Sequence, residues 1–185
     1  MTLQVDFDQD LWLYVPGAWP WEGFASIEQW RDALAGALAE AYRYDAPMRE
    51  WVAATAEGLA RGVDEDEHRF AYFSRPHEAL GIASIYELAR ADEVSAEQML
   101  GVHDPAAVRE VQIVPFEDGR LGPGLSATRH VADETGAITV VTHWLWRLPD
   151  RDVLMIAGDP DLARFETLRE DYDTLARAIG TVPDE

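Results

Sequence analysis

Apolar residues in the last third of the chain follow the pattern of β-strands, in short runs separated by turn residues. The runs predict strands at residues 107–117, 125–133, 137–148 and 152–158. Gly, Pro, Asp and Thr fill the short links between them. Because links this short join neighbouring antiparallel strands, we expect this third to form an antiparallel meander.

Apolar residues elsewhere recur at helical spacing. The predicted helices cover residues 26–43, 45–62, 95–100 and 160–179. Ser26, Asp45 and Ser95 are the expected N-caps of the first three, and Asp159 of the last, which Gly180 should end. The apolar stripe of the second helix is expected to contain Met48, Trp51, Val52, Thr55 and Leu59.

Strand patterns also occur before the meander, at residues 3–16 as one or two strands, and at 68–74 and 79–89. Together these elements predict an α+β protein with an antiparallel sheet of about six or seven strands and helices on both faces, an α/β/α sandwich. No linker or repeat interrupts the pattern, so residues 1–185 are expected to form a single domain.

Two tryptophans stand out in the strand predicted at 137–148. Side chains alternate between the faces of a strand, so Trp144 and Trp146 share one face, and His143 and Arg147 lie on the other. The partner strand 152–158 is apolar on both faces and must be covered on both. The two tryptophans are therefore expected to pack under a helix, the alternative being a partly open groove for a ligand or partner.

Four segments give the chain a resemblance in pattern to the PsbP-like fold, including its actinobacterial relatives. They are "LWLYVPGAW", "GPGLSATRHV", "VVTHWLWRLPDRDVLMIAG" and "DPDLARFETLREDYDTLARAI". The resemblance covers most of the chain and implies the same sandwich. It also implies a function in binding other proteins, because members of this fold act as assembly factors, secretion accessories or chaperones.

The charge of the chain limits its partners. There are 35 acidic residues against 15 basic ones, a net charge of −20, and every basic residue is Arg. A field of this sign repels nucleic acids and anionic membranes and attracts a basic protein or peptide. The absence of Lys and Asn also fits GC-rich coding DNA, and the acidity also fits adaptation to salt or simple solubility.

Cysteine is absent, which excludes disulfides and thiolate chemistry. The acidic start lacks the apolar core of a signal peptide, and no apolar run approaches the roughly 20 residues of a membrane span. A cytoplasmic location is therefore expected.

Catalytic and metal-binding motifs were sought without success. None of the five histidines has the spacing of a helical zinc site, and "GLSAT" lacks the last Gly of a nucleophile elbow. A turn centred on Thr135 would pair His130 with Val140, placing His130 and His143 on opposite faces and out of contact. Each histidine is expected to bond a backbone carbonyl instead.

The charged run "DEDEHR" is expected to be a solvated turn. No catalytic residue, metal or cofactor is predicted.

Aromatic residues also gather in the Gly- and Pro-rich loop "PGAWPWEGF". Trp19, Trp21 and Phe24 can anchor a partner if they are exposed, or can plug the end of the sheet. A pocket between this loop and the tryptophan hairpin is a further hypothesis. The candidate binding residues are Trp19, Trp21, Phe24, His143, Trp144, Trp146 and Arg147.

The function that these observations favour is a non-enzymatic protein-binding accessory, chaperone-like or of the immunity type, with an acidic surface for a basic protein. One alternative is a small-ligand-binding protein with a tryptophan-lined pocket. The other is an enzyme of unrecognised class that would use His130, His143 and Arg147.

Overall fold

The computed structural model describes residues 2–182. The chain divides into two compact units, the first formed by Met1–Trp12 with Ala71–Glu185 and the second by Leu13–Phe70. The expectation of a single domain stays a prediction.

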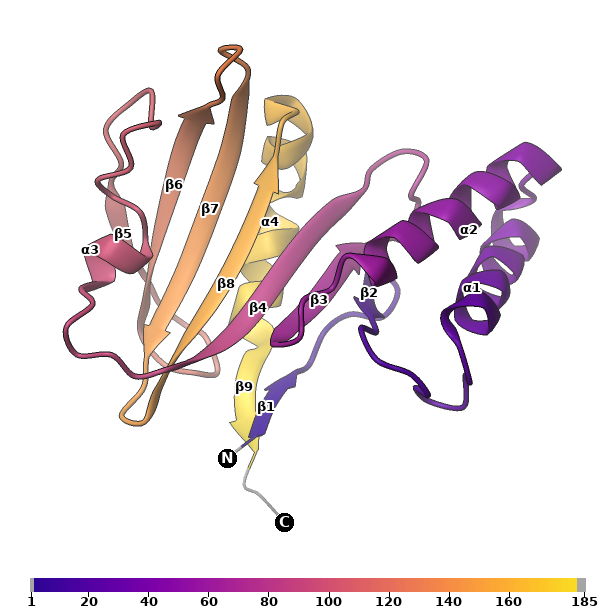
Figure 1. Cartoon of the computed structure of the whole chain (residues 1–185), viewed down its shortest axis with the longest axis horizontal. Helices are drawn as coiled ribbons and strands as arrows, with labels where there is room; N and C mark the ends of the chain where they lie inside the picture. The colour runs from indigo at the N-terminus through magenta and orange to yellow at the C-terminus, as the bar shows by residue number, and fades with distance from the viewer. Residues whose placement is uncertain (1, 183–185) are drawn as a thin grey trace. The chain divides into compact units, whose positions relative to one another are not determined.

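The strands are β1 Thr2–Val5, β2 Trp12–Val15, β3 Glu67–Tyr72, β4 Gly81–Ala89, β5 Ile113–Phe116, β6 Gly124–Ala132, β7 Ile138–Arg147, β8 Arg151–Asp159 and β9 Ile179–Val182. The helices are α1 Ile27–Tyr42, α2 Ala46–Arg61, α3 Ala96–Met99 and α4 Leu162–Ala178. Seven strands form one sheet in the order β2-β3-β4-β8-β7-β6-β5, and β1 pairs with β9 (Figure 1). The predicted class, α+β with a sheet of about six or seven strands, is confirmed.

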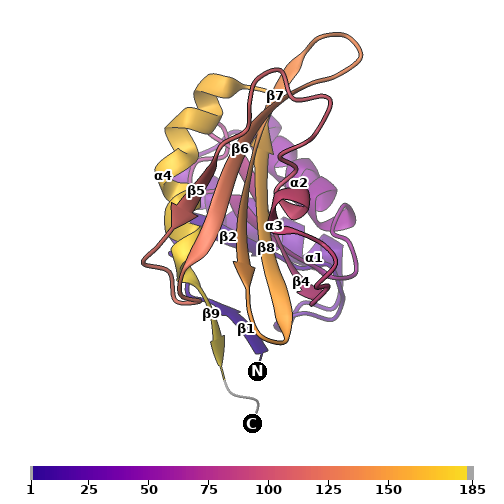
Figure 2. The ribbon, with the colours of Figure 1, turned by 90° about the vertical axis from the view of Figure 1, so that its left-hand side faces the viewer.

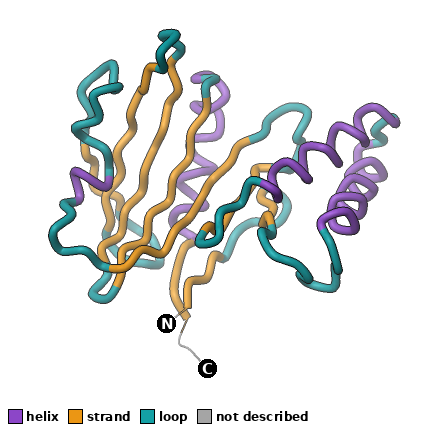
Figure 3. The backbone as a smooth tube through the Cα atoms, viewed as in Figure 1, coloured by secondary structure: helices purple, strands orange, loops and turns teal. Residues whose placement is uncertain are grey.

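The meander predicted from the last third is present in the first unit, where β5, β6, β7 and β8 pair in sequence (Figure 3). The register of β6 and β7 pairs His130 with Val140 and Ala127 with His143. The turn centred on Thr135 thus sets the register that the sequence predicted.

Helices lie on both faces of this part of the sheet, with α4 on one side and the short α3 on the other (Figure 2). Neighbouring residues of β7 show the two environments. The Trp144 indole bonds Asp173 of α4, whereas Leu145 packs in a cluster with Leu100, the residue that follows α3. A strand apolar on both faces is therefore covered on both, as expected.

The face under α4 is built from aromatic side chains. Trp144 and Trp146 are each 1% exposed, and Tyr172 of α4 is fully buried. The ring centroids of Trp144 and Tyr172 are 6.4 Å apart, and Trp146 meets Phe116 of β5 edge-on at 5.7 Å. The prediction that the two tryptophans pack under a helix is confirmed.

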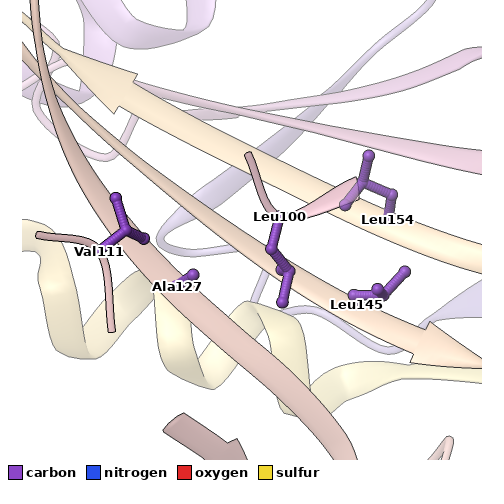
Figure 4. Packing of buried hydrophobic residues seen from close by; sticks show 5 residues of the cluster. All are labelled: Leu100, Val111, Ala127, Leu145 and Leu154. Carbon is purple, nitrogen blue, oxygen red and sulfur yellow. The ribbon is translucent and has the colours of Figure 1, made fainter. Parts of the chain in front are cut away.

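The opposite face is closed by smaller aliphatic side chains (Figure 4). The buried cluster there comprises Leu100, Val111, Ala127, Leu145 and Leu154. Leu100 and Val111 come from the segment that follows α3. This segment therefore supplies the cover of that face.

The second unit pairs α1 with α2. Asp45 caps α2 by accepting a hydrogen bond from the Met48 N–H, as predicted. The predicted apolar stripe is partly wrong, because Trp51 is 41% exposed and the buried positions of α2 are Val52, Ala56, Leu59 and Ala60. Small alanines take the inner positions because they let helices approach closely.

The run "DEDEHR" is only partly a solvated turn. Glu67 is 5% exposed and pairs through both carboxylate oxygens with the Arg69 guanidinium. The same guanidinium donates to the carbonyls of Leu59 and Gly62 at the end of α2. This buried pair joins the end of the helix to β3, a contact that the charge pattern gave no reason to expect.

The first strand of the meander is shorter in the structure than the sequence predicted. The strand expected at 107–117 is reduced to β5, and within 107–112 only Ala107 forms a bridge, with Val131. The apolar residues of this stretch reflect coverage of the sheet, because Val111 is buried in the aliphatic cluster. In the second unit, Ser26 is the N-cap residue of α1 as predicted, but its side chain makes no cap hydrogen bond.

The cap of the last helix is Asp161, whose carboxylate accepts from the N–H groups of Ala163 and Arg164. The expected cap, Asp159, is the last residue of β8, and both its carboxylate oxygens accept from the Arg164 guanidinium. Gly180 does follow the helix, but the chain continues as β9 and pairs with β1. That pairing joins strands from opposite ends of the sequence, which local patterns do not reveal.

Candidate functional site

The first unit has a groove between α4 and strands β5, β6 and β7, with a volume of about 590 Å³. We call it the arginine groove, because three guanidinium side chains line it. They are Arg109, Arg169 and Arg177. Its size lies within the roughly 300–1,000 Å³ typical of small-molecule pockets.

Hydroxyl groups form part of the lining of the arginine groove. Ser126 and Thr128 alternate along β6 and so share one face, and the register places Thr142 of β7 directly opposite Thr128. The Oγ1 atoms of the two threonines are 2.8 Å apart and hydrogen-bonded. Thr142 is buried at 3% exposure, so its hydroxyl is held in place by this bond.

The arginines come from two sides of the groove. Arg169 and Arg177 are eight residues apart on α4, whereas Arg109 precedes β5. The Arg177 guanidinium lies 5.0 Å from the centre of the Phe116 ring, and Arg169 bonds Glu166 at 2.9 Å. Each is oriented by a neighbour but has further N–H donors, since a guanidinium carries five.

A carboxylate from α4 completes the charged lining. Asp173 accepts a hydrogen bond from the Trp144 indole N–H at 2.9 Å. Since Trp144 is almost fully buried, this bond fixes Asp173 at the border between the aromatic core and the groove. Glu110 is the other acidic residue of the lining.

Trp144 and Trp146, two candidate binding residues, therefore lie behind the groove and do not line it. Trp146 is packed so closely that its Nε1 atom is buried without a hydrogen-bond partner. A binding role for them stays a prediction. They contact residues of the groove lining, because the Trp144 indole bonds Asp173 and the Trp146 ring meets Phe116 edge-on.

His143 lies on the opposite face of the sheet and is 5% exposed. Its Nε2 atom is 3.4 Å from the guanidinium of Arg129, which forms a short ion pair with Asp104. Burial, and then the positive charge of Arg129, lower the pKa of His143 from 6.5 to about 4. The imidazole is therefore neutral at pH 7.

Arg147 is also on this opposite face and takes part in a buried ion-pair network. It donates to Asp152, which is 1% exposed and also pairs with Arg90. Arg147 further donates to the Ala91 carbonyl. Through these hydrogen bonds, Arg147 of β7 links β8 to the segment that follows β4.

His130 is separated from His143 and Arg147, as the strand register predicted. Its Nε2 atom accepts from Arg109 at 2.9 Å, and burial together with the charges of Arg109 and Arg169 lowers its pKa. The expectation that His130 and His143 bond backbone carbonyls is wrong, because arginine contacts Nε2 in both and Nδ1 is buried without a partner. Among residues 2–182, no group of three or more His, Asp or Glu could hold a metal ion.

The aromatic loop belongs to the second unit. Trp21 and Phe24 are bridged to each other and their rings stack at 6.4 Å, while Trp19 lies 6.0 Å from Trp30 of α1. The Trp21 ring also lies 5.8 Å from that of Tyr14. Trp19, Trp21 and Phe24 are half-buried, so this loop packs on its own unit, and a role in binding stays a prediction.

Comparison with known proteins gives no relative. No family model matches the chain, and neither the curated proteins nor the solved structures contain a match. The resemblance to the PsbP-like fold therefore stays a prediction. Across the described range, 2–182, none of the helices has the length and apolar character needed to cross a membrane.

Sequence reasoning missed the arginine groove. Its arginines are separated along the chain and each looks like an ordinary surface charge. One signal was available: Ser126 and Thr128 alternate along β6 and Thr142 pairs with Thr128 across the hairpin, which places three hydroxyl groups together on the face that also carries Trp144.

Proposed function

We propose that this chain is a binding protein whose site is the arginine groove, and that its ligand is a small molecule with an anionic group. The observation that carries this proposal is the placement of three arginines around a hydroxyl-lined cavity, in a chain with 35 acidic residues. Guanidinium groups donate paired hydrogen bonds that match carboxylate geometry. This is the small-ligand alternative of the sequence analysis, placed at a different site.

A thermal-shift screen of small carboxylates tests the proposal, followed by calorimetric titration of any hit. We expect the double variant Arg169→Gln/Arg177→Gln to lose at least tenfold in affinity, because it removes two positive charges and two guanidinium groups able to donate paired hydrogen bonds. Arg75→Gln is the matched control, since Arg75 is exposed, pairs with Glu78 and lies outside the lining. Equal binding by both variants would show that the groove is not the site.

We also propose the protein-binding function that the charge favours. A net charge of −20 attracts a basic protein, and the PsbP-like resemblance implies the same class of function in a cytoplasmic accessory. A pull-down from host lysate at low and high salt tests it. A basic protein recovered in stoichiometric amount at low salt and released at high salt supports this function, and recovery unaffected by salt contradicts a charge-driven contact.

A further inference from the structure

The charge balance of the arginine groove limits what it can hold. Its lining has three guanidinium groups against the carboxylates of Asp173 and Glu110, a surplus of one positive charge. Arg169 also bonds Glu166, which reduces this surplus further. A ligand with several negative charges would be left unbalanced in the groove and repelled by a chain of net charge −20.

Asp173 adds a fixed acceptor to a site with many donors. The Trp144 indole N–H donates a hydrogen bond to one of its oxygens, Oδ1. Because an ionised carboxylate has about four lone-pair positions, this bond orients Asp173 and leaves it able to accept more. An ammonium group is the natural partner of a half-buried carboxylate that is already held in place.

The hydroxyl pair supplies a further donor. Thr128 and Thr142 carry two hydroxyl hydrogens, and the bond between their Oγ1 atoms uses one. The other remains free to donate to a carbonyl or carboxylate oxygen of a ligand. Ser126 follows on the same face of β6.

The groove is much larger than an inorganic ion requires. A volume of about 590 Å³ corresponds to roughly twenty waters at ~30 Å³ each. This space accommodates a molecule the size of a tripeptide, whose two charged ends are separated and whose amide groups bond hydroxyls.

We infer that the arginine groove binds a short zwitterionic peptide, whose carboxylate meets the arginines and whose ammonium group meets Asp173. The inference rests on the proposed small-ligand function and names its ligand class. Such a ligand has no net charge, so the acidic chain does not repel it, and it matches the groove in having both signs.

Tri-alanine is the probe, compared with its N-acetylated form and its C-terminal amide in calorimetric titrations of the whole protein. We expect free tri-alanine to bind at least tenfold more tightly than either blocked form. The Trp144 indole N–H signal in a nitrogen–proton NMR spectrum, assigned by its loss in Trp144→Phe, should shift with the free peptide because Asp173 holds that group.

Asp173→Asn separates the role of the carboxylate from its position. Asn keeps an oxygen that can accept from Trp144 but lacks the charge, so this variant should bind the free and N-acetylated peptides about equally. Glu170→Gln is the control, since Glu170 is exposed on α4 and outside the lining, and it should retain the preference.

The outcomes distinguish this inference from the proposed function. Equal binding of the free and N-acetylated peptides by the unmodified protein would overturn the zwitterionic ligand and leave the anion site standing. No binding of either peptide would overturn the inference, and the site itself would fall if the carboxylate screen were also negative.

Discussion

The two faces of the sheet in the first unit are built by the same strands and have opposite properties. Under α4 the core is aromatic, and at its margin toward β5 and β6 it opens into the arginine groove. On the other face, α3 and the segment to Val111 close an aliphatic cluster, and the polar residues there are paired inside the protein. The difference shows which polar residues beside a core are candidates for binding. They are the ones that line a cavity and have N–H or O–H donors not used inside the protein.

Arg147 and Arg177 illustrate the contrast. Arg147, which the sequence singled out beside the tryptophans, donates hydrogen bonds to Asp152 and to the Ala91 carbonyl. Arg177, which no pattern distinguished, stands over the Phe116 ring at the groove. The Arg147 guanidinium is held by hydrogen bonds inside the fold, whereas the Arg177 guanidinium lines a cavity.

The largest expected effect comes from removing the aromatic core of the α4 face. Trp144→Ala should lower the free energy of unfolding by about 4 kcal/mol, since it opens a large cavity and deprives Asp173 of its donor. Chemical denaturation measures it. Trp51→Ala, at a tryptophan that is 41% exposed, should lose less than half as much, and equal losses would contradict the assignment of Trp144 to the core.

Acid should weaken the opposite face through His143. The unfolded chain takes up a proton near pH 6.5, whereas the folded imidazole does so only near pH 4, so stability falls as the pH drops between these values. The full loss is about 3 kcal/mol at 1.36 kcal/mol per pKa unit. Unfolding curves from pH 7.5 to 4 measure it.

His143→Gln is the control for this acid effect. The difference in stability between the variant and the unmodified protein should depend on pH only in the window from 6.5 to 4. A constant difference across the range would show that the imidazole is not buried as a neutral group.

Close packing on the α4 face can be tested at Gly124. A Cβ atom there would lie 2.8 Å from the Trp146 ring and from the Leu145 carbonyl oxygen, so Gly124→Ala should cost about 2 kcal/mol. Gly58→Ala, in α2 with open space around the added methyl, should instead stabilise the protein by up to about 1 kcal/mol. Thermal unfolding of the two variants gives opposite shifts if the packing is as described.

The smallest expected effect concerns the short helix that covers the aliphatic face. Ser95 and Gln98 form a capping box at the start of α3, and Ser95→Ala should cost about 1 kcal/mol. Hydrogen exchange at Leu100 and Val102 reports the loosening of this cover. Ser26→Ala, at a helix start without a side-chain cap bond, should have a smaller effect on its own helix.

Local patterns in the sequence were sufficient for most of the fold. The period of two in residues 138–147 predicted β7 and the burial of Trp144, and the turn residues fixed the pairing of His130 with Val140. They were sufficient because burial of alternate side chains and the geometry of short turns act between residues that are close along the chain.

The sequence by itself thus determined the class of the fold, the meander and the partition of residues between the two faces. Only the tertiary structure decided the pairing of β1 with β9 and the convergence of Arg109, Arg169 and Arg177 on one cavity. The physical reason is distance along the chain. The three arginines, for example, meet because α4 packs beside β5, and no periodicity of neighbouring residues records where a distant helix will place its side chains.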